Sequence, residues 1–109
     1  MTVPVESSMR VLMTTDGIDG VWNYSIRLAA ALEAYGVQIA LATMGPALNE
    51  SQRQQVRRLS HVQLYESTFK LEWMRDPWSD VDRAGQWLLG LAEGLKPDLV
   101  HLNGYVHAA

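Results

Sequence analysis

The stretch Met9–Trp22, MRVLMTTDGIDGVW, decides the fold of this 109-residue chain. Its apolar run at 11–13 is typical of a strand that is covered on both faces of a sheet. Turn residues interrupt the run between positions 16 and 20. From Val21 onward the apolar residues recur at the spacing of an amphipathic helix. A parallel α/β domain opens in this way, and its ligands bind where strand ends meet helix starts.

The two glycines of this turn allow two interpretations. Gly17 and Gly20 would let backbone approach a ligand closely, and the first N–H groups of the helix favour an anion. Their G-x-x-G spacing matches neither the dinucleotide fingerprint nor the P-loop. In the second interpretation both glycines only serve a tight turn, and Asp19 caps the helix. The candidate site at this turn comprises Asp16, Gly17, Gly20, Val21 and Trp22.

Strands and helices alternate along the rest of the chain. Gly36 is expected as the left-handed C-cap of the first helix, and Asn49 with Gln52 predicts a capping box that opens the second. Asp76 and Pro77 are expected to start the third helix. Further strands are predicted at 37–43, 62–65 and 99–102. Because the alternation implies right-handed crossovers, the predicted fold class is α/β, a Rossmann-like three-layer domain with a parallel sheet of about four strands.

The segment 66–78 is rich in large apolar side chains, which include Phe69, Leu71, Trp73, Met74 and Trp78. One interpretation is a satellite core under a long connection. The other is a lid or wall of a binding cleft, since long loops in compact domains often carry function.

Composition excludes several classes of function. The net charge is −3 and the chain has no cysteine, so no disulfide or thiolate chemistry is possible. The basic run at Arg53, Arg57 and Arg58 is interpreted as a solvated helix face, and no nucleic-acid partner is expected. No segment is apolar enough to span a membrane. Residues 1–8 lack a signal pattern and are expected to be a disordered lead-in to a cytoplasmic protein.

The exit of the fourth strand is the second candidate site. Parallel strands end at one edge of the sheet, so Asn103, Gly104 and Tyr105 are expected beside the glycine turn. His101 lies inside that strand and is interpreted as a core histidine rather than a catalytic one. The three histidines share no metal-ligand spacing, so no metal site is predicted. The chain stops at Ala109, where another crossover helix would begin. Domain 9–109 is therefore expected to be incomplete at its C-terminus.

Three stretches resemble the N-terminal domain of family 4 glycosyltransferases, which are GT-B enzymes of two Rossmann-like domains. They are MRVLMT at 9–14, DGIDGVWNY at 16–24 and PDLVHLN at 97–103. The segment at 71–78, with LEWM and DPW, looks like one bacterial branch of that family. The resemblance covers nearly the whole chain from Met9. It depends on the order of these stretches along the chain rather than on any one motif.

The resemblance implies the acceptor-side domain of an enzyme that transfers a sugar from a nucleotide-sugar donor, with retention of configuration. In the family the glycine turn lies near the donor diphosphate, and the C-terminal domain binds most of the donor. No metal or other cofactor is usually needed. The implied partners are the nucleotide sugar, a sugar or glycoconjugate acceptor, and the C-terminal domain that this chain lacks. The chain alone is expected to be inactive.

The chain also departs from the family. Nothing matches the E-x7-E donor motif, which belongs to the C-terminal domain, and the family's catalytic histidine follows a later strand than the four found here. Some relatives have His-x-His at the fourth strand, where this chain has Asn103 in the second position. Asn103 keeps hydrogen-bonding capacity but not acid–base capacity. The catalytic residues therefore stay unassigned.

Two alternatives stay open. One is a stand-alone flavodoxin-like ligand-binding or regulatory module. Asp16 is placed suitably for a phosphorylated aspartate, but the partner acids and the lysine of a receiver module are not in place. The other is an interfacial patch of Trp73, Met74 and Trp78 for lipid-linked acceptors. Membrane association is weakly supported because these aromatic residues lack a basic face.

Overall fold

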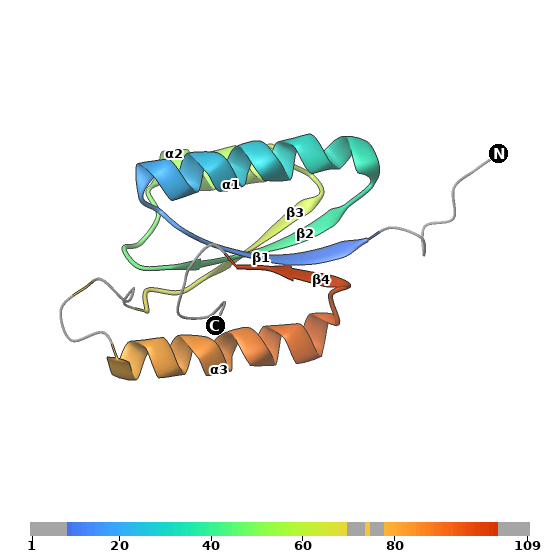
Figure 1. The fold of residues 1–109 in the computed structure, drawn as a ribbon. Helices are drawn as coiled ribbons and strands as arrows, with labels where there is room; N and C mark the ends of the chain where they lie inside the picture. The colour runs from blue at the N-terminus through green and yellow to red at the C-terminus, as the bar shows by residue number, and fades with distance from the viewer. Residues whose placement is uncertain (1–8, 70–73, 75–77, 103–109) are drawn as a thin grey trace.

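The computed structural model describes residues 9–69, 74 and 78–102. Four parallel strands form one sheet in the order β3-β2-β1-β4. The strands are β1 (Arg10–Asp16), β2 (Gln38–Met44), β3 (Val62–Glu66) and β4 (Leu99–His101). The helices are α1 (Asp19–Leu32), the 3-10 turn η2 (Glu33–Tyr35), α2 (Glu50–Arg57) and α3 (Trp78–Leu95). Helices α1 and α2 cover one face of the sheet and α3 covers the other (Figure 1), so the predicted three-layer α/β fold is confirmed.

Strand β1 lies inside the sheet, and its side chains at 11–16 are all buried. Val11 and Met13 belong to the core under α1 and α2, whereas Leu12 belongs to the core under α3. Alternate side chains of a strand point to opposite faces. The apolar run at 11–13 is therefore explained by burial on both faces, as the sequence predicted.

Two of the predicted signals at element ends, Gly36 and the pair Asn49 and Gln52, are also confirmed. Gly36 has φ 70° and donates its N–H to the carbonyl of Glu33 at 3.1 Å, as a left-handed cap does. The Asn49 side chain accepts from Gln52 N at 2.8 Å, and the Gln52 side chain accepts from Asn49 N at 2.9 Å. This pair is the capping box of α2. The second strand runs one residue later than the predicted 37–43, and the fourth ends one residue before 102.

His61 ties the start of β3 to the end of α1. Its ring is 7% exposed, and Nε2 lies 2.7 Å from the carbonyl oxygen of Ala29. A carbonyl only accepts, so Nε2 carries the hydrogen. The N–H of Glu33 donates to the carbonyl of Ala30 and not to that of Ala29. The His61 ring therefore supplies a hydrogen-bond donor to a carbonyl in the last turn of α1. The other nitrogen, Nδ1, is 3.1 Å from a carboxylate oxygen of Glu33 without hydrogen-bond geometry.

The segment before α3 contributes to the core on the α3 face. Phe69 and Met74 pack against that core, and the Phe69 ring lies 5.9 Å from the Trp87 ring between centroids. These contacts support the satellite-core interpretation for these two residues. Trp78 begins α3 and is 66% exposed. The other predictions for this segment, at Leu71, Trp73, Asp76 and Pro77, lie outside the described residues, as does the lead-in at 1–8.

Within the described part of the chain, no helix combines the length and apolar character needed to cross a membrane.

Candidate functional site

Asp16 shapes the turn at the carboxyl end of β1. It is 8% exposed, and its Oδ1 accepts a hydrogen bond from the N–H of Ile18 at 2.7 Å. Ile18 has extended backbone angles and is the N-cap of α1, with no side-chain capping bond. The prediction that Asp19 caps the helix is therefore wrong. Asp19 is the first helical residue, because the Asp16 carboxylate fixes the turn two residues earlier as an Asx turn.

Helix α2 holds the turn from the side. Gln52 Nε2 donates to the carbonyl oxygen of Gly17 at 2.9 Å, while Gln52 Oε1 takes part in the capping box. Further along α1, the indole Nε1 of Trp22 donates a hydrogen bond to Gln55 Oε1 at 2.8 Å. Trp22 is 2% exposed and belongs to the core. The Trp22 ring therefore joins α1 to α2 beside the turn.

The two glycines of the turn differ in their surroundings. A Cβ on Gly17 would lie 3.1 Å from Leu48 Cδ2, so close packing against the segment before α2 explains this glycine. A Cβ on Gly20 would meet nothing within 4 Å, and Gly20 is a helical residue without a positive φ. Glycine in a helix costs about 1 kcal/mol relative to alanine. A side chain at position 17 would therefore press on Leu48, whereas position 20 has no such neighbour among the described residues.

The first backbone N–H groups of α1 lie around Gly20. The first bond within α1 runs from the N–H of Trp22 to the carbonyl of Ile18 at 2.9 Å. The N–H groups of residues 19–21 precede it and have no acceptor within the helix. They carry the positive end of the helix dipole, which attracts negative charge. Val21 is half-buried beside them.

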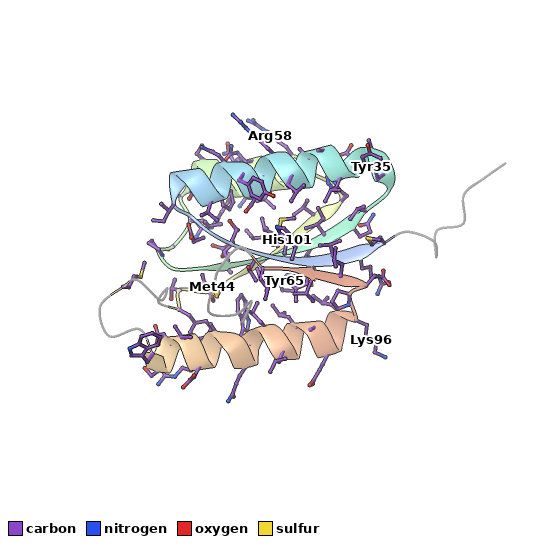
Figure 2. The ribbon with its side chains drawn as sticks, in the orientation of Figure 1. Tyr35, Met44, Arg58, Tyr65, Lys96 and His101 are labelled. Carbon is purple, nitrogen blue, oxygen red and sulfur yellow. The ribbon has the colours of Figure 1, made fainter. Side chains whose placement is uncertain are left out.

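The fourth strand brings His101 to the same edge of the sheet. Parallel pairing aligns Met13 of β1 with His101, the last residue of β4. His101 lies on the α1 side of the strand layer (Figure 2) and is half-buried rather than enclosed in the core. Its ring lies 6.5 Å from the ring of Tyr24 between centroids, at an interplanar angle of 33°. The predicted exit-turn residues Asn103, Gly104 and Tyr105 lie outside the described residues.

Tyr24 is a further candidate site residue that the sequence did not single out. It is 54% exposed and so lies outside the buried side of α1. Its spacing of four residues from Gly20 was the available signal, because residues four apart share one face of a helix. Its pairing with His101 depends on how the sheet is ordered, which local spacing does not reveal.

The arginines of α2 form ion pairs with neighbouring carboxylates. Arg53 Nη2 is 3.1 Å from Glu66, and Arg57 Nη1 is 2.7 Å from Glu50. The hydrogen bond and positive charge of Arg57 lower the pKa of Glu50, and the hydrogen bond and negative charge of Glu66 raise the pKa of Arg53. These pairs favour the predicted solvated face. In the described ranges, no group of three or more His, Asp or Glu side chains is placed to hold a metal ion.

Two hollows formed by the described residues lie away from the glycine turn. A groove of about 490 Å³ opens at the amino edge of the sheet near Arg10 and Pro97. An apolar groove of about 300 Å³ lies between α3 and β4, against Leu88, Leu89 and Val100.

Comparison with known proteins places the fold. A solved structure, that of LpCGTa in complex with UDP, matches the chain with a TM-score of 0.59 at 18% sequence identity. The match covers 88% of this chain and 25% of that chain, so this chain spans about a quarter of the length of LpCGTa. No protein-family model matches the chain. No curated protein matches it either. The shared fold is thus one that, in LpCGTa, belongs to a UDP-binding protein.

Proposed function

We propose that this chain forms the acceptor-side, amino-terminal domain of a longer glycosyltransferase that uses a nucleotide-sugar donor. The observation that carries the proposal is Gly20. It is a helical glycine with open space around it, at the start of α1 and at the carboxyl edge of a parallel sheet. The likeness in fold to LpCGTa, solved with UDP, supports the same class of ligand, because a nucleoside diphosphate is the leaving group of such a transfer.

The chemistry assigned to the turn is stabilisation of the leaving diphosphate. As the bond between sugar and phosphate breaks, negative charge grows on the phosphate oxygens. The N–H groups of residues 19–21 are fixed donors that need no rearrangement to meet this charge. Gln52 and Asp16 hold the turn in place from outside the ligand space. The donor is a substrate, and the proposal assigns no metal or other cofactor to this domain.

A second domain completes the proposed enzyme. It would bind most of the donor, while this domain holds the acceptor and faces the diphosphate. Retention of anomeric configuration and membership of family 4 belong to the same proposal. The 109-residue chain by itself is expected to transfer no sugar.

The test begins with the intact mass of the native gene product and peptide mapping beyond Ala109. If the product is longer, its consumption of nucleotide sugars is measured for the parent and for Gly20→Val. The valine would keep the phosphate away from the N–H groups of residues 19–21, so turnover should fall by about 100-fold or more, the loss expected when an oxyanion donor can no longer act. Gly90→Val on α3 is the matched control, since a Cβ at Gly90 also meets nothing within 4 Å.

Two outcomes would contradict the proposal. If Gly20→Val and Gly90→Val have equal turnover, the turn does not serve the diphosphate. If the native product ends at Ala109, the enzyme proposal fails and a stand-alone binding module takes its place. Gly17→Val is a poor probe because Leu48 already fills the space beside Gly17.

A further inference from the structure

Tyr24 and His101 form an aromatic pair at the carboxyl edge of the sheet. Tyr24 comes from the second turn of α1, and His101 is the last residue of β4. The Tyr24 ring is 54% exposed, and one side of it is backed by the half-buried His101 ring at 6.5 Å between centroids. An exposed aromatic ring that is held from behind is a fixed, flat apolar surface with a polar hydroxyl at its tip.

Gly20 leaves room in front of this ring. It lies one helical turn before Tyr24 on the same face of α1, about 6 Å away along the axis. Among the described residues, a Cβ at Gly20 would meet nothing within 4 Å, so Gly20 adds no bulk to the helix face that precedes Tyr24. Arg27 follows three residues after Tyr24 and is exposed on the same side of the helix. This face therefore combines an open space, an aromatic ring and a guanidinium with five N–H donors.

We propose that this face, formed by Gly20, Tyr24 and Arg27 and backed by His101, binds the pyranose ring of the acceptor by stacking on Tyr24. A pyranose has a C–H face that suits an aromatic ring, and its rim of hydroxyl groups needs donors and acceptors such as those of Arg27 and the Tyr24 hydroxyl. The inference rests on the proposed function. It places the acceptor within one helical turn of the N–H groups that are assigned to the leaving diphosphate.

A second exposed tyrosine on the same helical segment serves as a matched control. Tyr35 ends η2 at the far end of α1 (Figure 2) and is 80% exposed. Four residues before it lies Ala31 rather than a glycine, and no ring contact backs it among the described residues. Tyr35 thus has the chemistry of Tyr24 without its surroundings.

The experiment uses the 109-residue chain and saturation-transfer NMR with a panel of methyl pyranosides and disaccharides. We expect saturation transfer to one face of a sugar ring. Tyr24→Ala should raise the dissociation constant by about five- to tenfold. Gly20→Leu, which adds bulk at this face, should weaken binding similarly, whereas Tyr35→Ala should bind nearly as the parent does. Circular dichroism confirms that each variant is folded.

Equal binding by Tyr24→Ala and Tyr35→Ala would overturn the inference, and so would the absence of saturation for every sugar in the panel. These failures are distinguishable from a failure of the proposed function. A longer gene product that transfers sugar with an acceptor KM indifferent to Tyr24→Ala keeps the proposed function and removes this site. A longer product that consumes no nucleotide sugar removes the function itself.

Discussion

The two faces of the sheet are built differently. Under α1 and α2 the core is reinforced by specific polar bonds, such as those from Trp22 to Gln55 and from Ser25 to Thr15. Among the described residues, the buried core under α3 is smaller, and an apolar groove opens between that helix and β4, where Leu89 is 64% exposed. We call the face that α1 and α2 cover the closed face. The glycine turn, α2 and Trp22 all belong to this face, so the closed face supports the candidate site.

The largest effect that sharpens this comparison is expected from matched core truncations. Leu41→Ala on the closed face should lower the free energy of unfolding by about 3–5 kcal/mol, since Leu41 is fully buried and its surroundings have little freedom to collapse. Leu88→Ala should cost about 2 kcal/mol, because Leu88 borders the open groove and the cavity adds less. Urea unfolding measures both. An equal or larger loss at Leu88 would break the comparison.

A smaller effect is expected at the bond between His61 and α1. His61→Phe keeps a ring of similar size but leaves the Ala29 carbonyl without its buried donor. Losing one partner of a buried hydrogen bond costs about 1–3 kcal/mol. Thermal or urea unfolding checks the loss, with Glu33→Gln as the control, because the Glu33 carboxylate is largely exposed and its contact lacks hydrogen-bond geometry. A neutral His61→Phe would show that this bond does not hold the closed face.

The smallest expected effect is the pH dependence of stability that the Glu50 and Arg57 pair of α2 contributes. Arg57 lowers the pKa of Glu50 below its ordinary value of 4.5 in the folded chain, so the pair contributes stability above that value. The contribution is lost as the pH falls below about 4.5 and through the lowered folded pKa. Both side chains are exposed, so the loss is small and salt weakens it. Urea midpoints of the parent and Glu50→Gln at pH 7 and pH 3 should converge at the lower pH, and a constant difference would contradict the pair's role.

Much of the fold was predictable because its signals are local. The apolar run at 11–13, the Asn49 and Gln52 capping box and the cap at Gly36 each depend on residues within a few positions. The error at Asp19 had a local cause too. Asp16 and Asp19 are both able to cap a turn, and only the extended backbone at Ile18 decides between them.

The candidate site was less predictable, because its contacts join distant segments. From the sequence alone Trp22 is an ordinary helix residue, because its hydrogen-bond acceptor, Gln55, lies in another helix. Likewise, His61 meets Ala29, and Tyr24 meets His101, only after the strands assemble in the order β3-β2-β1-β4. Whether a glycine is needed for packing, as at Gly17, or stands in open space, as at Gly20, is also a property of the assembled surroundings.

The double role of Gln52 has a consequence for local unfolding. One side chain closes the first turn of α2 and also holds the Gly17 carbonyl, so fraying of that helix start releases the glycine turn in the same step. Local openings in proteins occur in cooperative units rather than residue by residue. The turn and the start of α2 therefore form one such unit, and backbone amides in both should exchange with solvent at matched rates although they lie far apart in the chain.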